Sequence, residues 1–225
     1  MNASLELAKM WDFLSVDQPS PISARAISPE GAVPRLPVKN VTVTASKYPC
    51  VNARKLAFQK SASALGHEGY NVYIVMNSID PHFAGNETNG IAVRDSDISA
   101  RRLLLIDFDR IETSAPATDH EIAEALSVAD QVSEYLHERW CITPHKTMSG
   151  NGIHLYVPLD NIANDPASKT SCQRLLIALA KKFNTGTIRV DTSVYNASRI
   201  TKVLGTIARK GTATAERPFR MAHAL

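Results

Sequence analysis

Hydrophobic residues along this chain recur with two periods, one typical of strands and the other of helices. Alternating or short β-rich apolar runs predict strands near residues 40–45, 71–77, 101–109, 187–191 and 198–205. Between residues 145 and 160, a turn that contains two glycines separates two apolar runs, and this pattern predicts a β-hairpin.

Apolar residues at helical spacing predict helices over residues 5–14, 51–65, 118–140 and 165–183. The third helix has the clearest start, because Thr118 and Glu121 have the spacing of a capping box. Asp165 and Pro166 are typical of an N-cap and a first helical residue. Because strands and helices interleave around a sheet that includes a hairpin, the predicted fold class is mixed α+β.

The segment from residue 15 to residue 39 contains five of the twelve prolines and has no lasting hydrophobic period. Such a composition favours turns, so we predict a long connecting loop outside the core. The chain is therefore expected to consist of an N-terminal helix with its proline-rich connection, residues 1–40, and a main domain, residues 41–225.

The composition is that of an ordinary globular protein, with 44% hydrophobic and 21% charged residues in 225. A formal net charge of +3 is compatible with a polyanionic partner, and positive residues gather after residue 188. Three separated cysteines without metal-ligand spacing predict neither a zinc site nor a disulfide framework. No membrane span of roughly 20 apolar residues and no secretory signal is recognisable, so a cytoplasmic protein without membrane contact is expected.

Two acidic residues end the apolar run LLLIDFDR. Side chains alternate along a strand, so Asp107 and Asp109 should share one face. Two carboxylates held that close repel each other, and a divalent cation with a preference for oxygen ligands, Mg²⁺ or Mn²⁺, would offset the repulsion. The alternative is a strand end at which both acids simply reach solvent.

The turn of the predicted hairpin has the sequence SGNGIH. Gly150 and Gly152 flank Asn151, and backbone N–H groups at such a turn can approach an anion, with Ser149 and His154 close by. The turn is therefore a candidate phosphate-binding element. A plain hairpin turn followed by a hydrogen-bonded strand histidine explains the same residues.

A third acid, Asp191, follows a predicted strand, and Arg199, Lys202 and Lys210 follow within twenty residues. A third acid and several cations therefore share one neighbourhood. The alternative is a turn-starting aspartate followed by solvated surface charges.

Together these segments resemble the catalytic motifs of the archaeo-eukaryotic primase (AEP) superfamily, and specifically the primase-polymerases of phages, plasmids and other mobile elements. The resemblance rests on VMNSID, LIDFDR, MSGNGIHLYV and DTSVYNASRITKVLGTIARKG, with RPFR near the end, and covers roughly residues 71–220. Leu204 replaces the family's usual proline and Ala208 its common asparagine, which leaves the role of that turn open.

The resemblance implies an AEP catalytic core of two interlocked αβ halves, with an RRM-like antiparallel or mixed sheet, an N-terminal αβ unit and helices packed on the sheets. It implies that Asp107, Asp109 and Asp191 hold two Mg²⁺ or Mn²⁺ ions. The implied nucleotide ligands are Ser149, Gly150, Asn151, Gly152, His154, Arg199 and Lys210. Implied sugar or template contacts are Asn77, Lys202, Arg217 and Arg220, and candidates for base stacking are Tyr48, Tyr70 and Tyr195.

The function that follows from the resemblance is that of a DNA primase and template-dependent polymerase. Such an enzyme makes and extends primers on single-stranded DNA from NTPs or dNTPs, releases pyrophosphate, and works beside a replicative helicase. This chain is then a stand-alone domain or the N-terminal part of a longer primase-helicase in a bacterial, phage or plasmid setting. Two alternatives are a replication-initiator module that binds nucleic acid without strong catalysis and a metal-dependent glycosyltransferase. The preferred sugar, the template sequence and the oligomeric state are left undetermined by the sequence.

Overall fold

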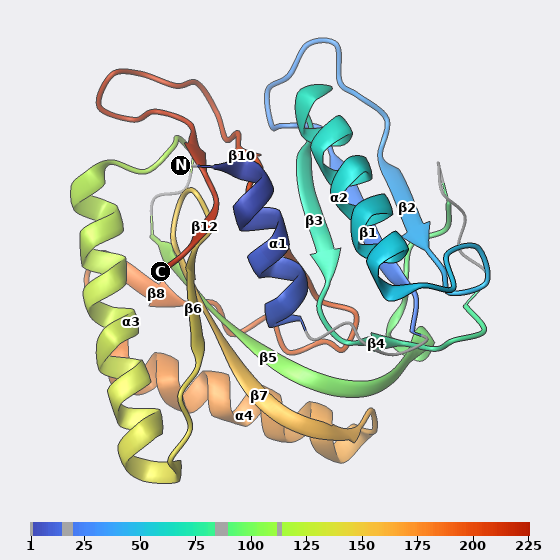
Figure 1. Cartoon of the computed structure of the whole chain (residues 1–225). Coiled ribbons are helices and arrows are strands. Elements are labelled where there is room, and N and C mark those ends of the chain that lie inside the picture. The colour runs from blue at the N-terminus through green and yellow to red at the C-terminus, as the bar shows by residue number, and fades with distance from the viewer. Residues whose placement is uncertain (1, 15–19, 84–89, 112–113) are drawn as a thin grey trace.

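Two antiparallel sheets, each with helices packed on one face, organise the chain in the computed structural model (Figure 1). The structure describes residues 2–14, 20–83, 90–111 and 114–225. The arrangement confirms the predicted α+β class. Among the described helices, none is long and apolar enough to cross a membrane.

The first sheet has the strand order β2–β1–β3–β9, and each neighbouring pair is antiparallel. Its strands are β1 (Ile22–Ile27), β2 (Lys39–Val43), β3 (Asn71–Val75) and β9 (Ile200–Lys202). Helix α2 (Val51–His67) packs on β1, β2 and β3, and α1 (Ala3–Phe13) packs beside α2.

Strand β1 lies inside the segment for which the sequence predicted a connecting loop, so that prediction is wrong for residues 22–27. The strand pairs with β2 on one side and with β3 on the other. Its buried face carries Ile22, Ala24 and Ala26. Alanine gives a weak hydrophobic signal and prolines flank the strand, so the period of two was easy to miss.

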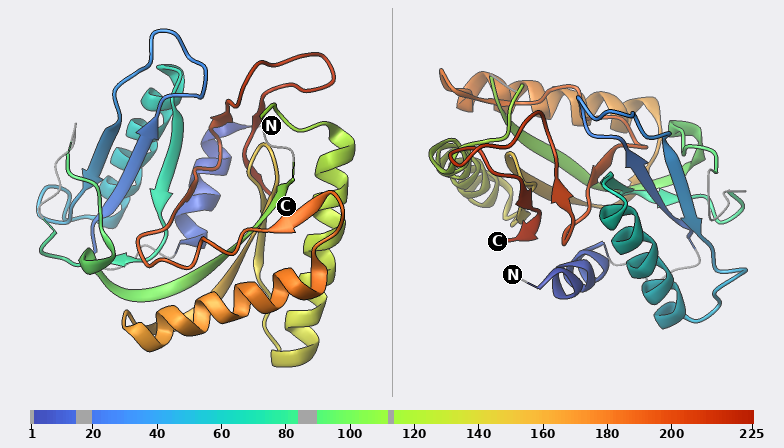
Figure 2. Two further views of the ribbon diagram at one scale, coloured as in Figure 1. Left: turned by 180° about the vertical axis from the view of Figure 1, so that it is seen from behind. Right: turned by 90° about the horizontal axis from the view of Figure 1, so that it is seen from above.

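The second sheet has the order β12–β6–β7–β5–β4, and β8 pairs with the end of β5. Its strands are β4 (Ser78–Ile79), β5 (Ile98–Arg110), β6 (His145–Met148), β7 (Ile153–Ala163), β8 (Ile188–Val190) and β12 (His223–Ala224). A 3₁₀ turn, η1 (Asp95–Asp97), precedes β5, and β10 (Ile207–Ala208) pairs separately with β11 (Arg220–Met221). Helices α3 (Asp119–Trp140) and α4 (Pro166–Phe183) pack on the second sheet (Figure 2).

The helix starts and the hairpin follow the local signals in the sequence. Thr118 and Glu121 form the predicted capping box of α3. Asp165 caps α4, with Pro166 as its first residue. Strands β6 and β7 form the predicted hairpin, in which Met148 pairs with Ile153. These predictions are confirmed. They could be made from the sequence because each depends on contacts within a few residues.

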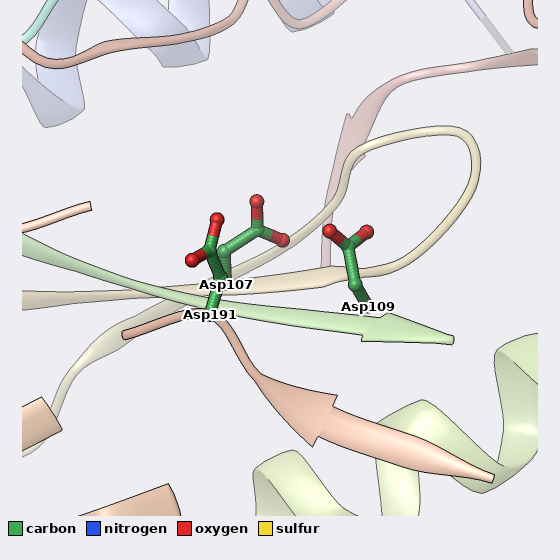
Figure 3. A group of neighbouring side chains, drawn as sticks. All are labelled: Asp107, Asp109 and Asp191. Atoms are coloured by element: carbon green, nitrogen blue, oxygen red, sulfur yellow. The ribbon is translucent and has the colours of Figure 1, made fainter. Parts of the chain in front are cut away.

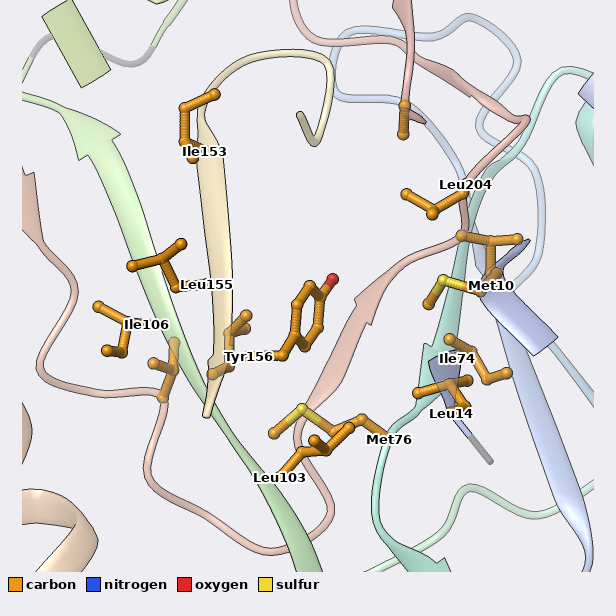
Figure 4. Packing of buried hydrophobic residues seen from close by; sticks show 14 of the residues in the cluster. Met10, Leu14, Ile74, Met76, Leu103, Ile106, Ile153, Leu155, Tyr156 and Leu204 are labelled. Atoms are coloured by element: carbon orange, nitrogen blue, oxygen red, sulfur yellow. The ribbon is translucent and has the colours of Figure 1, made fainter. Parts of the chain in front are cut away.

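A continuous apolar core joins the two sheets (Figure 4). Met10, Leu14 and Ile74 belong to the same buried cluster as Tyr156 of β7, and the centres of the Phe13 and Tyr156 rings lie 4.5 Å apart. Because side chains alternate along β5, Leu104, Ile106 and Phe108 take the face opposite to Asp107 and Asp109. The core thus fixes β5 rigidly and leaves its two acids on the face toward the first sheet.

Candidate active site

Three aspartates from two neighbouring strands converge at one end of the second sheet (Figure 3). Asp107 and Asp109 lie on one face of β5, as alternation predicted. Asp191 follows β8, which pairs antiparallel with the end of β5, and the Asp191 N–H donates to the Asp107 carbonyl at 2.9 Å. Ligand oxygens of the three carboxylates lie within 4.8 Å of one another.

The electrostatics of the three acids favour a cation. Burial, and next the charge of Asp107, raise the pKa of Asp109 to about 6, although the charges of Lys210 and His154 act in the opposite direction. Ionising Asp109 beside the other two carboxylates is therefore costly without a compensating positive charge. An all-oxygen donor set of this kind fits Mg²⁺ or Mn²⁺.

His154 is fixed beside the acids by a buried hydrogen-bonded chain. It pairs with Asp107 across β5 and β7, and its Nε2 lies 3.3 Å from Asp107 Oδ1. On the other side of the ring, Nδ1 lies 3.2 Å from both the Tyr156 hydroxyl and Thr201 Oγ1. The Tyr156 hydroxyl and Thr201 Oγ1 are themselves 2.6 Å apart. The imidazole therefore has one edge in the core and one edge toward the carboxylates.

The SGNGIH loop is packed tightly, and a side chain at either of its glycines would clash with neighbouring atoms. Gly150 has φ +104°, and a Cβ there would lie 2.3 Å from the Ala208 Cβ. A Cβ on Gly152 would lie 2.4 Å from the carbonyl oxygen of Phe108 in β5. The loop therefore sits directly against β5 and β10.

The N–H groups of these two glycines already have partners within the loop. The Gly150 N–H donates to Met148 Sδ at 2.8 Å, and the Gly152 N–H donates to Ser149 Oγ at 3.2 Å. The Asn151 side chain accepts a hydrogen bond from the Ala117 N–H at 3.1 Å. The loop thus presents side chains to the acids, whereas the sequence had suggested free glycine N–H groups.

An open cavity of about 430 Å³ lies beside the acids, and strands of the first sheet line its other wall. The residues singled out from the sequence that line it are Asp107, Asp109, Ser149, Asn151, His154, Asp191, Arg199, Lys202 and Lys210. The structure therefore gathers residues from three separate sequence motifs around one space.

Positive charge enters this cavity from the segment after Asp191. The guanidinium of Arg199 donates from Nε to Asn196 Oδ1 at 2.9 Å and from Nη2 to the Ser193 carbonyl at 3.1 Å. Lys202 is buried, and its Nζ donates to the Ile207 carbonyl at 2.8 Å. Arg199 and Lys210 thus bring positive charge to the cavity, and Lys210 is close enough to lower the pKa of Asp109.

Sequence reasoning missed Tyr73, which lines the cavity on β3. Lys202 Nζ lies 5.4 Å from the centre of its ring. The strand NVYIV carried a usable signal, because alternation places Tyr73 on the face opposite to the buried Val72 and Ile74. Tyr70, by contrast, is buried in the core and donates its hydroxyl hydrogen to the Pro37 carbonyl at 2.9 Å.

Tyr48 and Tyr195, the other two stacking candidates, are partly buried against the core and are not among the residues that line this cavity. Of the tyrosines in the described part of the chain, Tyr73 is the one that faces the acids' cavity.

Asn77, a suggested sugar contact, is buried away from the cavity. Its Nδ2 donates to the Ala197 carbonyl at 2.9 Å, and its Oδ1 accepts from the N–H groups of Arg102 and Leu103. Asn77 therefore ties the segment that carries Asp191 and Arg199 to strand β5.

Arg217 and Arg220, suggested as template contacts, are also placed away from the cavity. Arg217 forms an ion pair with Glu121 at 2.8 Å, and Arg220 forms one with Asp119 at 2.7 Å. Both arginines thus hold the C-terminal segment against the start of α3.

No protein-family model and no curated protein matches the sequence. Solved structures do match the fold. One is the AEP domain of the primase-polymerase of cyanophage S-2L, with a TM-score of 0.55 and 19% sequence identity over 98% of this chain and 88% of that chain.

Another is the polymerase domain of Ligase D from Mycobacterium tuberculosis, whose structure was solved in complex with DNA. Its TM-score is 0.53, and the 17% identity extends over 97% of this chain and 78% of that chain. The chain therefore has the AEP fold that its motifs had suggested, and the likeness spans both sheets.

Proposed function

We propose that this chain is the catalytic domain of an AEP primase-polymerase, a nucleotidyltransferase that adds nucleotides to a growing chain on a single-stranded DNA template. The observation that carries the proposal is the convergence of Asp107, Asp109 and Asp191 within 4.8 Å. The cavity above these acids is lined by cations, and the surrounding fold is shared with polymerase domains. The proposed domain includes α1 and β1, since both pack with the rest of the chain.

In the proposed reaction, the oxygen of a primer 3′-hydroxyl, or of the first nucleotide's hydroxyl, forms a bond to the α-phosphorus of an incoming NTP or dNTP. The bond to the β-phosphate breaks, pyrophosphate leaves, and the hydroxyl gives up its proton. Two Mg²⁺ or Mn²⁺ ions held by the three aspartates would supply charge stabilisation for the attacking and leaving oxygens.

The other residues of the cavity bind and orient in this proposal. His154, 3.3 Å from Asp107, holds that carboxylate in place. Arg199 and Lys210 would bind the triphosphate, with help from Ser149, because charge-assisted contacts to phosphate are strong. Tyr73 and Lys202 form the wall on which the sugar or base would rest.

Template contacts in the proposed enzyme are mostly contacts to phosphate, and hence weakened by salt. The contacts of Asn77, Arg217 and Arg220 favour supporting roles, and we assign them no direct contact with nucleotide or template. A helicase, in the same chain or separate, is the natural partner of such a domain.

The test is a primer-synthesis and primer-extension assay with single-stranded DNA, labelled nucleotides and Mg²⁺ or Mn²⁺. We expect Asp107→Asn and Asp191→Asn to lower incorporation by about 1,000-fold or more, since each replaces a charged carboxylate ligand of the metal ions by a neutral amide. Asp12→Asn is the matched control, because Asp12 lies on α1 in a surface ion pair with Lys55. Parallel reactions with NTPs and with dNTPs measure the preferred sugar.

The other outcomes separate the alternatives. Folded wild-type protein that incorporates nothing with either metal contradicts the proposal. Binding of template without incorporation would favour the initiator module. Transfer of sugar from a nucleotide sugar would favour the glycosyltransferase.

A further inference from the structure

The carboxylate of Asp95, on η1, accepts hydrogen bonds from the loop between Asp191 and Arg199, on the side away from the cavity. Its Oδ1 accepts hydrogen bonds from the Ser198 N–H at 2.9 Å and from Ser198 Oγ at 2.7 Å. Asn196 Nδ2 lies 3.5 Å from the same oxygen. One carboxylate oxygen therefore holds Ser198, which directly precedes Arg199, and Asn196, which lies three residues before it.

Hydrogen bonds within the loop connect Asn196 to Arg199 at one end and, through Ser193, to Asp191 at the other. Asn196 accepts twice from Arg199, through Oδ1 from Nε at 2.9 Å and through its carbonyl from the backbone N–H at 3.2 Å. Arg199 also donates to the Ser193 carbonyl, and the Ser193 N–H donates to Asp191 Oδ1 at 2.8 Å. A metal-ligand candidate and a phosphate-ligand candidate are thus linked in one hydrogen-bonded loop.

Asp95 itself is held rigidly by the second sheet. Asn164, just after β7, donates through Nδ2 to the Asp95 carbonyl at 2.7 Å and to the Ile98 carbonyl at 3.1 Å. Burial raises the pKa of Asp95, but hydrogen bonds from Ser198 and Asn196 outweigh this effect and keep the pKa below its usual value. The carboxylate is therefore a charged, fixed acceptor at neutral pH.

We propose that Asp95 is a positioning residue for nucleotide binding, which acts through Ser198 and Asn196 to hold the Arg199 guanidinium toward the acid cavity. The proposal rests on the proposed function, because it assigns Arg199 to the triphosphate. Asp95 does not itself line the cavity. Its loss should therefore weaken nucleotide binding more than it slows the chemical step.

The first measurement is the Kd for a labelled nucleoside triphosphate with Mn²⁺, without template, by equilibrium dialysis. We expect Asp95→Ala to raise the Kd by about 10-fold, and Asp95→Asn, which retains an acceptor, to raise it less. Asp97→Ala is the matched control. Asp97 lies on the same 3₁₀ turn, where its carboxylate accepts from the Arg94 N–H at 2.7 Å, and its loss should leave the Kd unchanged.

The second measurement shows whether the effect passes through Arg199. In a double-mutant cycle, Asp95→Ala should add little to the Kd of Arg199→Ala, because the group that it positions is already gone. In extension assays, Asp95→Ala should raise the nucleotide KM more than it lowers kcat. Melting temperatures identify any variant that has lost its fold, and Asp95→Asn then serves as the test.

The outcomes distinguish the two proposals. If Asp95→Asn and Asp95→Ala both bind nucleotide as tightly as the wild type does, the proposed role of Asp95 is wrong and the proposed function stands. The role is also wrong if Asp97→Ala has the same effect, or if the effects of Asp95→Ala and Arg199→Ala add fully. Wild-type protein that binds no nucleoside triphosphate overturns both proposals.

Discussion

The ammonium group of Lys202 occupies a place where a positive charge is costly. Its side chain is only 4% exposed, lies against the ring of Tyr73, and finds its closest acceptor in a backbone carbonyl. Burial, and next the charge of Arg209, lower the pKa of Lys202 to about 7. The amine is then largely neutral just above neutral pH in the folded protein, whereas it stays protonated in the unfolded chain.

This difference predicts how stability depends on pH. Between pH 7 and pH 10 the unfolded chain binds the extra proton, so the free energy of unfolding should rise with pH. We expect the melting temperature of the wild type to gain roughly 5 °C between pH 6.5 and pH 9 relative to Lys202→Met, which has no proton to lose. Lys60→Met, on the exposed surface of α2, should keep the wild-type slope. Parallel slopes for Lys202→Met and the wild type would show that Lys202 is fully charged in the folded protein.

At the scale of elements, the hairpin loop and strand β5 fit together without spare room. A Cβ on Gly152 would lie 2.4 Å from the carbonyl oxygen of Phe108, the residue between Asp107 and Asp109. A methyl group at Gly152 must push the loop away from β5 or push β5 out of its register. Either movement changes the spacing between His154 and Asp107, which face each other across the same pair of strands.

We therefore expect Gly152→Ala to destabilise the protein by about 1–3 kcal/mol. It should also lower nucleotide incorporation by roughly 10- to 100-fold, because small misplacements of catalytic groups are costly. Gly186→Ala is the control, since a Cβ there meets nothing within 4 Å. Denaturant melts and extension assays measure both effects, and Gly152→Ala protein with full activity would contradict a tightly seated loop.

Elements with local signals were predictable, and elements made by distant contacts were not. Helix α3 and the β6–β7 hairpin carry caps, turns and periods within their own sequences. The two-residue strands β10, β11 and β12 have no period to detect, because their partners alone define them. Strand β1 stayed hidden since two of its buried positions are alanines.

The candidate site divides in the same way. Alternation was enough to place Asp107 and Asp109 on one face. Bringing Asp191 beside them depends on the pairing of β8 with β5, for which no local pattern codes, and only the resemblance suggested it. Asp95 looks like an ordinary turn residue in the sequence, because its partners lie about a hundred residues later. Arg217 and Arg220 resembled nucleic-acid contacts because their acidic partners on α3 are equally distant in sequence.

At the scale of the whole molecule, the C-terminal segment contacts α1, the second sheet and the start of α3. Strand β12 extends the second sheet at β6, and the Ala224 N–H donates to Glu6 of α1 at 2.8 Å. Further back, Arg217 reaches Glu121 at the start of α3, where Arg110 of β5 also forms an ion pair. Two guanidinium groups thus share one carboxylate at the junction of β5, α3 and the C-terminal segment.

Glu121 should make the attachment of this segment sensitive to acid. Burial raises its pKa, but hydrogen bonds from Arg217 and the Thr118 N–H and the charge of Arg110 lower it to about 2. Because the folded pKa lies below the unfolded value of 4.5, the stabilisation is complete above pH 4.5 and is lost as the pH falls toward 2.

We expect Glu121→Gln to cost about 1 kcal/mol at pH 7, roughly 3 °C in melting temperature, a modest value because the pair is partly exposed to solvent. The gap between variant and wild type should narrow as the pH falls from 4.5 toward 2, since the unfolded wild-type chain then binds a proton that the folded carboxylate does not. Glu134→Gln, at an exposed position of α3, should show neither the cost nor the pH dependence. Limited proteolysis at pH 7 gives a second measurement, in which the Glu121→Gln protein should be cut faster within residues 209–219. Equal cleavage of variant and wild type, together with equal melting temperatures, would mean that the C-terminal segment is held without this ion pair.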